Sequence, residues 1–173
     1  INFLVGNMDA LCSMEHTRAL PIFSKSVVSF FCRLSEVLLH DPRAKAYGDV
    51  IAFAFWLRKA SIENEAARYR ALGSRIGWGM AFHIAPSNIP VQFAVSLVYA
   101  LLAGNASVIR VSDKKFEQVD ILCETIRVLL HEEFQELRPY ICIVRYAHDN
   151  AATRVLSSRS RLNSIKFHLQ SFN

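Results

Sequence analysis

One asparagine stands between two prolines near the middle of the chain, in the segment Pro-Ser-Asn-Ile-Pro at residues 86–90. Because each proline ring fixes its backbone angle φ, this turn should hold Asn88 in place before any ligand arrives. A preorganised amide N–H is suited to stabilise an oxyanion as it develops on a carbonyl oxygen. Asparagine is also a frequent N-cap, so Asn88 is equally able to cap a helix that begins near Pro90. The residue pattern leaves both interpretations open.

A second group of polar residues, Arg110, Ser112 and Asp113, lies at the end of a β-branched stretch at 108–111. One interpretation is contact with the ribose and phosphate of a nucleotide. The other is a solvated strand end, with Ser112 or Asp113 capping the next helix. In open α/β sheets, ligands bind outside the carboxyl ends of the strands. This loop and the loop that holds Asn88 are therefore expected to face one crevice.

The elements that must position these residues follow from hydrophobic periodicity and from turn residues. The pattern predicts a strand at 80–85, a helix at 90–103, a strand at 108–111, a helix at 116–130 and a strand at 140–145. Gly104 and Asn105 form a typical left-handed stop after the first of these helices. The order βαβαβ indicates a parallel, right-handed half of a doubly wound sheet.

The residues before this unit are predicted to be mostly helical. Apolar side chains recur at helical spacing over 22–39, after Pro21, and again over 49–72. The fold class is therefore α/β, with N-terminal helices followed by a Rossmann-like βαβαβ half. We expect a helical region at 1–75, an α/β region at 76–156 and a divergent tail at 157–173.

Several function classes find no support in the sequence. The first predicted strand is not followed by GxGxxG, and the P-loop pattern does not occur. The net charge of +5 comes from scattered basic residues, so we expect no nucleic-acid partner. The purely apolar run at 93–103 is about half of the ~20 residues that a bilayer requires. No secretion signal is recognisable, so the expected location is the cytoplasm.

Metal binding and disulfide bonding are not expected either. The cysteines lack CxxC spacing, which is typical of reduced, mostly buried thiols, and the histidines lack the spacing of metal ligands. The four cysteines are Cys12, Cys32, Cys123 and Cys142.

These motifs together resemble a known family. The 86–90 turn resembles the Pro-x-Asn-x-Pro turn of the aldehyde dehydrogenase superfamily, and residues 103–113 resemble that superfamily's Ala-Gly-Asn…Lys-Pro-Ser-Glu strand. A closer resemblance, to the LuxC-type long-chain acyl-CoA reductases that make fatty aldehyde for bacterial luciferase, covers roughly 21–156. Its segments are 55–59 (Phe-Trp-Leu-Arg-Lys), 83–90 (His-Ile-Ala-Pro-Ser-Asn-Ile-Pro), 101–105 (Leu-Leu-Ala-Gly-Asn) and 147–149 (Ala-His-Asp).

The resemblance implies reduction of an activated fatty acyl group to aldehyde by NADPH, with NADH as a second option, through a thioester on a catalytic cysteine. Asn88 would stabilise the oxyanion of the thiohemiacetal. The implied cofactor contacts are Ile84, Ala85, Pro86 and Ser87 in the crevice, and Arg110, Ser112 and Asp113 along the adenosine half. The implied partners are a long-chain acyl-CoA or acyl-protein thioester, acyl-transferring subunits and, when the protein is complete, further copies of itself.

The chain also departs from the family's pattern. Arg110 stands where the superfamily usually has lysine, and Val111 replaces the proline of that motif. The family's Trp-Gly-Gly-Asp turn is missing, because no glycine follows Gly104. None of the cysteines lies in the context of the family's nucleophile, which belongs to a separate catalytic domain.

We therefore expect a fragment. The chain begins with Ile1 rather than methionine, and its tail departs from the family's sequence, so both ends are expected to be fragment boundaries. The expected function is that of part of an acyl thioester reductase, with no turnover by this piece alone. The alternative is a truncated, inactive remnant that at most binds nucleotide or an intact subunit.

Overall fold

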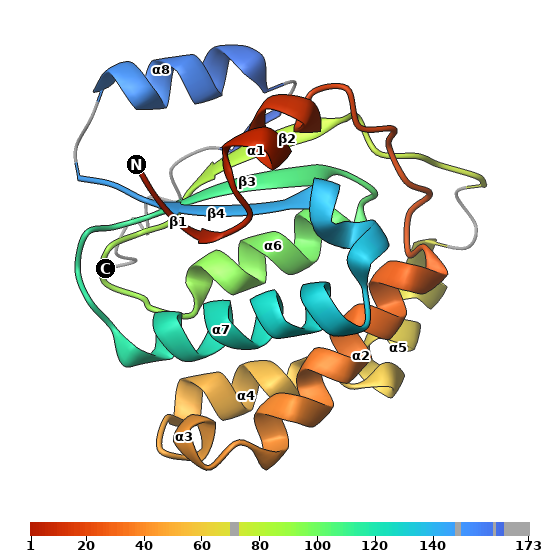
Figure 1. Ribbon diagram of the computed structural model, residues 1–173. Helices are drawn as coiled ribbons and strands as arrows, with labels where there is room; N and C mark the ends of the chain where they lie inside the picture. The colour runs from red at the N-terminus through yellow and green to blue at the C-terminus, as the bar shows by residue number, and fades with distance from the viewer. Residues whose placement is uncertain (70–72, 148–149, 161, 165–173) are drawn as a thin grey trace, which may run out of the picture.

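A computed structural model describes residues 1–69, 73–147, 150–160 and 162–164, and a sheet lies at its centre (Figure 1). Four strands run parallel, and the first strand of the chain pairs antiparallel at one edge. Among the described residues the strands are, in spatial order, β1 (Asn2–Val5), β4 (Ile141–Arg145), β3 (Ala106–Val111), β2 (Met80–Ile84) and β5 (Leu162–Ser164).

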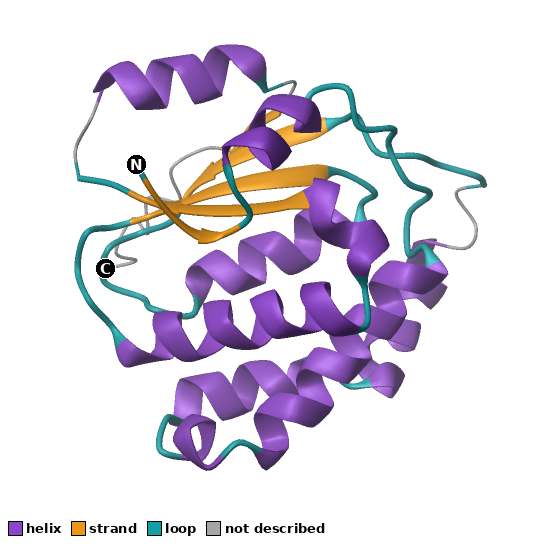
Figure 2. Ribbon diagram, viewed as in Figure 1, coloured by secondary structure: helices purple, strands orange, loops and turns teal. Residues whose placement is uncertain are grey.

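Helices cover both faces of the sheet (Figure 2). On one face lie α1 (Met8–Met14) and α8 (Asn150–Arg159), and on the other lie α6 (Gln92–Leu102) and α7 (Glu117–Glu132). A further layer packs outside α6 and α7. It consists of α2 (Lys25–His40), α3 (Pro42–Lys45), α4 (Gly48–Trp56) and α5 (Lys59–Tyr69). A 3-10 helix, η2 (Gln135–Tyr140), leads into β4.

The predicted α/β fold class is confirmed, and the βαβαβ unit appears as β2-α6-β3-α7-β4. Its strands pair in parallel, with Phe82 opposite Val108 and Val108 opposite Cys142. All six residues of β3 are buried, because helices cover this central strand on both sides. The apolar, β-branched composition of β3 reflects that double burial.

The N-terminal region differs from the prediction in two respects. The helical run predicted at 49–72 is interrupted, since α4 ends at Trp56 and α5 begins at Lys59, while residues 70–72 lie outside the described part. The strand β1 is not among the predicted elements. Four residues are too few to show an alternating pattern, and the partner strand β4 lies at the far end of the unit.

The helix caps that the sequence left open at the candidate site are not formed. The N-cap of α6 is Val91 and that of α7 is Phe116, and neither side chain makes a capping hydrogen bond. Hence Asn88 does not cap α6, and neither Ser112 nor Asp113 caps α7.

The segment expected to be a divergent tail, residues 157–173, includes the end of α8 and all of β5. Strand β5 adds to the sheet beside β2, with Phe82 opposite Asn163. Residues 165–173 lie outside the described part, as do His148 and Asp149 of the 147–149 motif.

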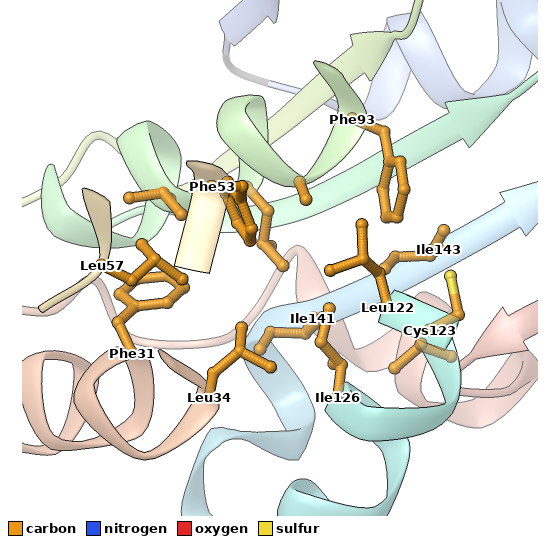
Figure 3. Packing of buried hydrophobic residues seen from close by; sticks show 14 of the residues in the cluster. Phe31, Leu34, Phe53, Leu57, Phe93, Leu122, Cys123, Ile126, Ile141 and Ile143 are labelled. Atoms are coloured by element: carbon orange, nitrogen blue, oxygen red, sulfur yellow. The ribbon is translucent and has the colours of Figure 1, made fainter. Parts of the chain in front are cut away.

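One hydrophobic cluster joins the outer helices to the α/β unit (Figure 3). It runs from α2 and α4, through α6 and α7, to the inner face of the sheet. Its labelled members are Phe31, Leu34, Phe53, Leu57, Phe93, Leu122, Cys123, Ile126, Ile141 and Ile143. The helical layer therefore fixes α6, and with it the loop that carries Asn88.

Candidate functional site at the carboxyl ends of β2 and β3

The order of the strands places a topological switch point beside β2. The chain passes from β2 to β3 to β4 in one direction across the sheet, then returns through α8 on the opposite face to β5 (Figure 1). The neighbours of β2 in the sheet are thus β3 on one side and β5 on the other. In open α/β sheets a crevice for ligands forms outside the carboxyl ends at this point. The loop at 85–91 leaves the carboxyl end of β2 and borders it.

Asn88 lies exposed on this loop. Its side chain makes no hydrogen bond with any residue that the structure describes, and the first turn of α6 closes instead through the backbone, with Gln92 N donating to Ile89 O at 3.2 Å. The capping interpretation left open by the sequence is therefore excluded. The amide of Asn88 remains available to a ligand at the switch point.

The four residues before Asn88 differ in their exposure. Ala85 is buried, and its N–H donates to the carbonyl of Arg110 at 2.9 Å, which continues the ladder between β2 and β3. Ile84 and Pro86 are half-buried, whereas Ser87 is exposed. Ser87 is thus the predicted crevice residue whose side chain can offer a hydrogen bond.

The loops after β2 and β3 lie against each other, as expected from their positions. Pro86 and Pro90 on one loop and Ser112 and Lys114 on the other line a small cavity of about 10 Å³. A cavity of this size holds at most about one water molecule. The two loops therefore leave no room between them for a larger ligand.

Arg110, for which a ribose or phosphate contact is predicted, makes its hydrogen bonds within the protein. It is buried, and its Nε and Nη2 donate to the carbonyl oxygen of Tyr146 at 3.2 and 2.9 Å. The guanidinium carbon also lies 5.4 Å from the centroid of the Tyr146 ring. The Tyr146 hydroxyl in turn hydrogen-bonds Thr153 of α8 at 3.1 Å. Arg110 thus joins β3 to the loop after β4.

The other two predicted contacts after β3 lie at the loop itself. Ser112 is buried at the end of the strand, and Asp113 is exposed beside it. Asp113 is therefore accessible to a ligand and Ser112 is largely covered.

His83, the first residue of the 83–90 motif, is expected from the sequence to be a strand residue that could line the site. It lies on β2 between Ile109 of β3 and Ser164 of β5, at the switch point itself. Its Nε2 is buried without a hydrogen-bond partner in the described part of the chain. Burial lowers the pKa of the imidazole to about 4, so the ring is neutral at physiological pH.

The cysteines do not provide an activated nucleophile at this site. Burial raises the pKa of the Cys142 thiol to about 12, and raises the pKa of Cys123 and of Cys32 as well. A raised pKa leaves the thiol protonated, whereas the thiolate is the reactive form. Cys12 is exposed on α1, which covers the sheet on the face opposite α6.

Two further kinds of site were sought among the described residues. In that part of the chain, no three or more His, Cys, Asp or Glu side chains are grouped so that they could hold a metal ion. Its helices are also too short or too polar for any of them to cross a membrane.

Comparison with known proteins finds one matching family. The family model described as "Acyl-CoA reductase (LuxC)" matches residues 45–159, about two thirds of the chain. The matched range contains the loops after β2 and β3, including Asn88. A search of curated proteins finds no match.

Proposed function

The chain belongs to the LuxC acyl-CoA reductase family, and from this premise we propose the function of the protein of which it is part. The intact protein reduces a long-chain acyl group, delivered as a thioester of CoA or of a partner protein, to the fatty aldehyde. NADPH is the proposed reductant, with NADH as a second option. The observation that carries this proposal is the exposed, unbound amide of Asn88 at the switch point of a family member.

Asn88 has a specific role in this proposal. The cofactor supplies a hydride when it is bound, and the acyl oxygen acquires negative charge while the thiohemiacetal forms. Asn88 Nδ2–H donates a hydrogen bond to that oxygen. The helical layer packs α6 in place, so the amide is oriented before the reaction and needs little reorganisation.

The cofactor would lie along the outer surface of the two loops. Ser87 and Asp113 are exposed there and have side chains that can hydrogen-bond a ribose. Ile84 and Pro86 supply apolar surface beside them. The buried guanidinium of Arg110 contributes positive charge behind the loops and, through Tyr146, fixes the end of β3.

We propose that the nucleophilic cysteine is supplied by another part of the intact protein. Three of the four thiols have raised pKa values, and the fourth lies on the opposite face from α6. On this basis the present chain binds NADPH but does not catalyse reduction of the acyl thioester. Purified chain mixed with NADPH and a long-chain acyl-CoA should bind the nucleotide and form no aldehyde. Aldehyde above a control without protein would overturn the proposed division of roles.

The catalytic role of Asn88 requires a complete enzyme for its test. Residues 45–159 of this chain would replace the matching residues of a full-length LuxC-family reductase. In the chimera, Asn88→Ala should lower kcat by about 10²–10³-fold, the usual effect of removing one oxyanion donor, with little change in KM.

The matched control is Asn64→Ala, which alters the same residue type at an exposed position on α5 and should leave kcat unchanged. An Asn88→Ala chimera with the kcat of its parent would remove Asn88 from the mechanism.

A further inference from the structure

A cavity at the far end of α6 is not used by the reaction proposed above. It has a volume of about 410 Å³, within the range of small-molecule sites. It lies between α5, the ends of α4 and α6, and the segments before α2 and β2. Because α6 starts at the carboxyl end of β2 and ends near the start of β3, this cavity and Asn88 lie at opposite ends of the helix.

The wall of this cavity is aromatic and unusually exposed. Trp78 is 74% exposed, Tyr99 58% and Tyr69 41%. The rings of Trp56 and Tyr99 lie against each other, with centroids 5.5 Å apart. An exposed cluster of large apolar side chains marks a site of ligand or partner binding.

The floor of the cavity is aliphatic and closed. Leu57, Ile62, Val98 and Leu102 all line it and are all buried. An apolar ligand that enters would therefore lie against the same side chains that form the hydrophobic core.

Polar groups at the cavity are few, and two of them are already engaged. The Oδ1 of Asn105 accepts a hydrogen bond from Trp78 N at 2.7 Å, and Glu65 pairs with Arg68 at 3.1 Å. A ligand rich in hydrogen-bonding groups would find few partners here. The chemistry of the lining instead suits a long hydrocarbon chain.

We propose that this cavity receives the far end of the alkyl chain of the acyl substrate. This inference rests on the proposed reduction of a long-chain acyl thioester. With the acyl carbon at Asn88, the tail must run along α6, whose 11 residues span about 16 Å. A long alkyl chain bridges that distance and a short one does not.

The surface of α6 offers a suitable path. The helix contains no charged residue. Gln92, Val95, Ser96 and Tyr99 are half-buried or exposed and, being three or four residues apart, lie along one side of it. An alkyl chain laid along this side passes from the loop of Asn88 to the cavity without meeting a charge on the helix.

Tryptophan fluorescence can test this proposal, because the two tryptophans of the chain, Trp56 and Trp78, both line the cavity. Dodecanoic acid brominated on its terminal carbon would be added to the full chain while tryptophan fluorescence is measured. We expect strong, saturable quenching by this acid, weak quenching by dodecanoic acid brominated beside the carboxylate, and none by bromobutyric acid. Equal quenching by the two dodecanoic acids, or none by either, would overturn the proposal.

Three substitutions test whether the fatty acid binds in this cavity. Ser61→Phe projects a ring into the cavity from α5, and Ala103→Phe does so from the exposed C-cap of α6. Displacing two methylene groups of the tail should weaken binding of the acid by about tenfold. The matched control is Ala60→Phe, at an exposed position outside the lining. If Ala60→Phe weakens binding as much as the other two variants, the cavity is not the binding site.

A second copy of the chain is the competing occupant of this aromatic surface. Sedimentation of the chain with and without the fatty acid distinguishes the two. A dimer that excludes the acid and is broken by Ala103→Phe would assign the surface to self-association and overturn the proposal. If NADPH binds but neither brominated dodecanoic acid quenches, the tail site fails while the reductase function stands.

Discussion

At the scale of single residues, Arg110 illustrates how a predicted ligand contact can be a structural link. Its guanidinium donates twice to the carbonyl oxygen of Tyr146, and lysine cannot reproduce this planar fork. Hydrogen bonds from charged groups stabilise a fold by about 1.5–3 kcal/mol each. Arg110→Lys should therefore lower the free energy of unfolding by about 1–2 kcal/mol, measured by urea denaturation, and leave NADPH affinity unchanged.

Arg18→Lys, at an exposed position, is the control and should not shift the urea midpoint. If Arg110→Lys instead weakens NADPH binding more than about tenfold at unchanged stability, the residue contacts the cofactor directly.

His83 makes a second prediction at this scale, because burial lowers its pKa from 6.5 to about 4. Between these two pH values the unfolded chain takes up a proton on this residue and the folded protein does not. The contribution of His83 to stability is therefore complete above pH 6.5 and is lost as the pH falls toward 4. At pH 5 the loss amounts to about 2 kcal/mol.

Replacing His83 by phenylalanine should remove this part of the acid sensitivity. Urea midpoints at pH 7 and pH 5 would differ less for His83→Phe than for the original chain, while the control His16→Phe, at an exposed position, should leave the difference as it was. An unchanged difference for His83→Phe would show that the imidazole titrates normally in the folded protein.

At the scale of elements, three backbone segments meet with no space for side chains. Leu20 N donates to Gly104 O, and Gly77 N donates to Leu20 O, each at 2.9 Å. A Cβ added to Gly77 would overlap Gly104 O, which is a backbone atom and cannot simply rotate away. Gly77→Ala should lower the free energy of unfolding by about 1–3 kcal/mol, measured by thermal or urea denaturation.

The comparison for this variant is Gly48→Ala. A Cβ there has no neighbour within 4 Å, and the residue begins α4. Alanine favours a helix over glycine by up to about 1 kcal/mol, so this variant should be neutral or stabilising. If the two variants were equally stable, the close approach at Gly77 would not be a constraint on the fold.

The elements that could be predicted from sequence are those whose signal is local. The strands β2, β3 and β4 and the helices α6 and α7 lie within a few residues of their predicted positions, because burial on one or both faces imposes a periodic pattern. The strand β1 was missed because its pairing depends on a partner far along the chain. The caps at Val91 and Phe116 were missed because neither uses a side-chain hydrogen bond.

At the candidate site, too, the features with a local sequence signal could be predicted and those that depend on distant partners could not. The exposed position of Asn88 on the loop after β2 follows from the turn chemistry of its two prolines and from the strand that precedes it. The partner of Arg110 is Tyr146, on a different loop, and the cavity lined by Trp56 and Trp78 joins segments that are adjacent only after folding. Such placements depend on tertiary packing, which no local pattern encodes.

At the scale of the whole molecule, the N-terminal helices and the α/β unit share one hydrophobic cluster. Two regions that bury the same core cannot lose it separately, so the chain should unfold in a single transition. Trp56 lies in α4 and Trp78 precedes β2, so Trp56→Phe and Trp78→Phe leave one reporter in each region. The remaining tryptophan of each variant should show the same urea midpoint as far-UV circular dichroism. An earlier transition at Trp56 alone would mean that the helical layer unfolds independently.

The antiparallel pairing of β1 with β4 also affects the time course of folding. Asn2 lies opposite Arg145, so this pair closes a loop that contains almost the whole α/β unit. The entropy lost in closing so long a loop makes this one of the later contacts to form, after the local βαβ units. Until then the outer edge of β4 carries unpaired backbone groups that can recruit a strand from another molecule. A change that weakens β1 should therefore first be observed as aggregation during refolding, with little loss of helix or strand in the chains that reach the native state.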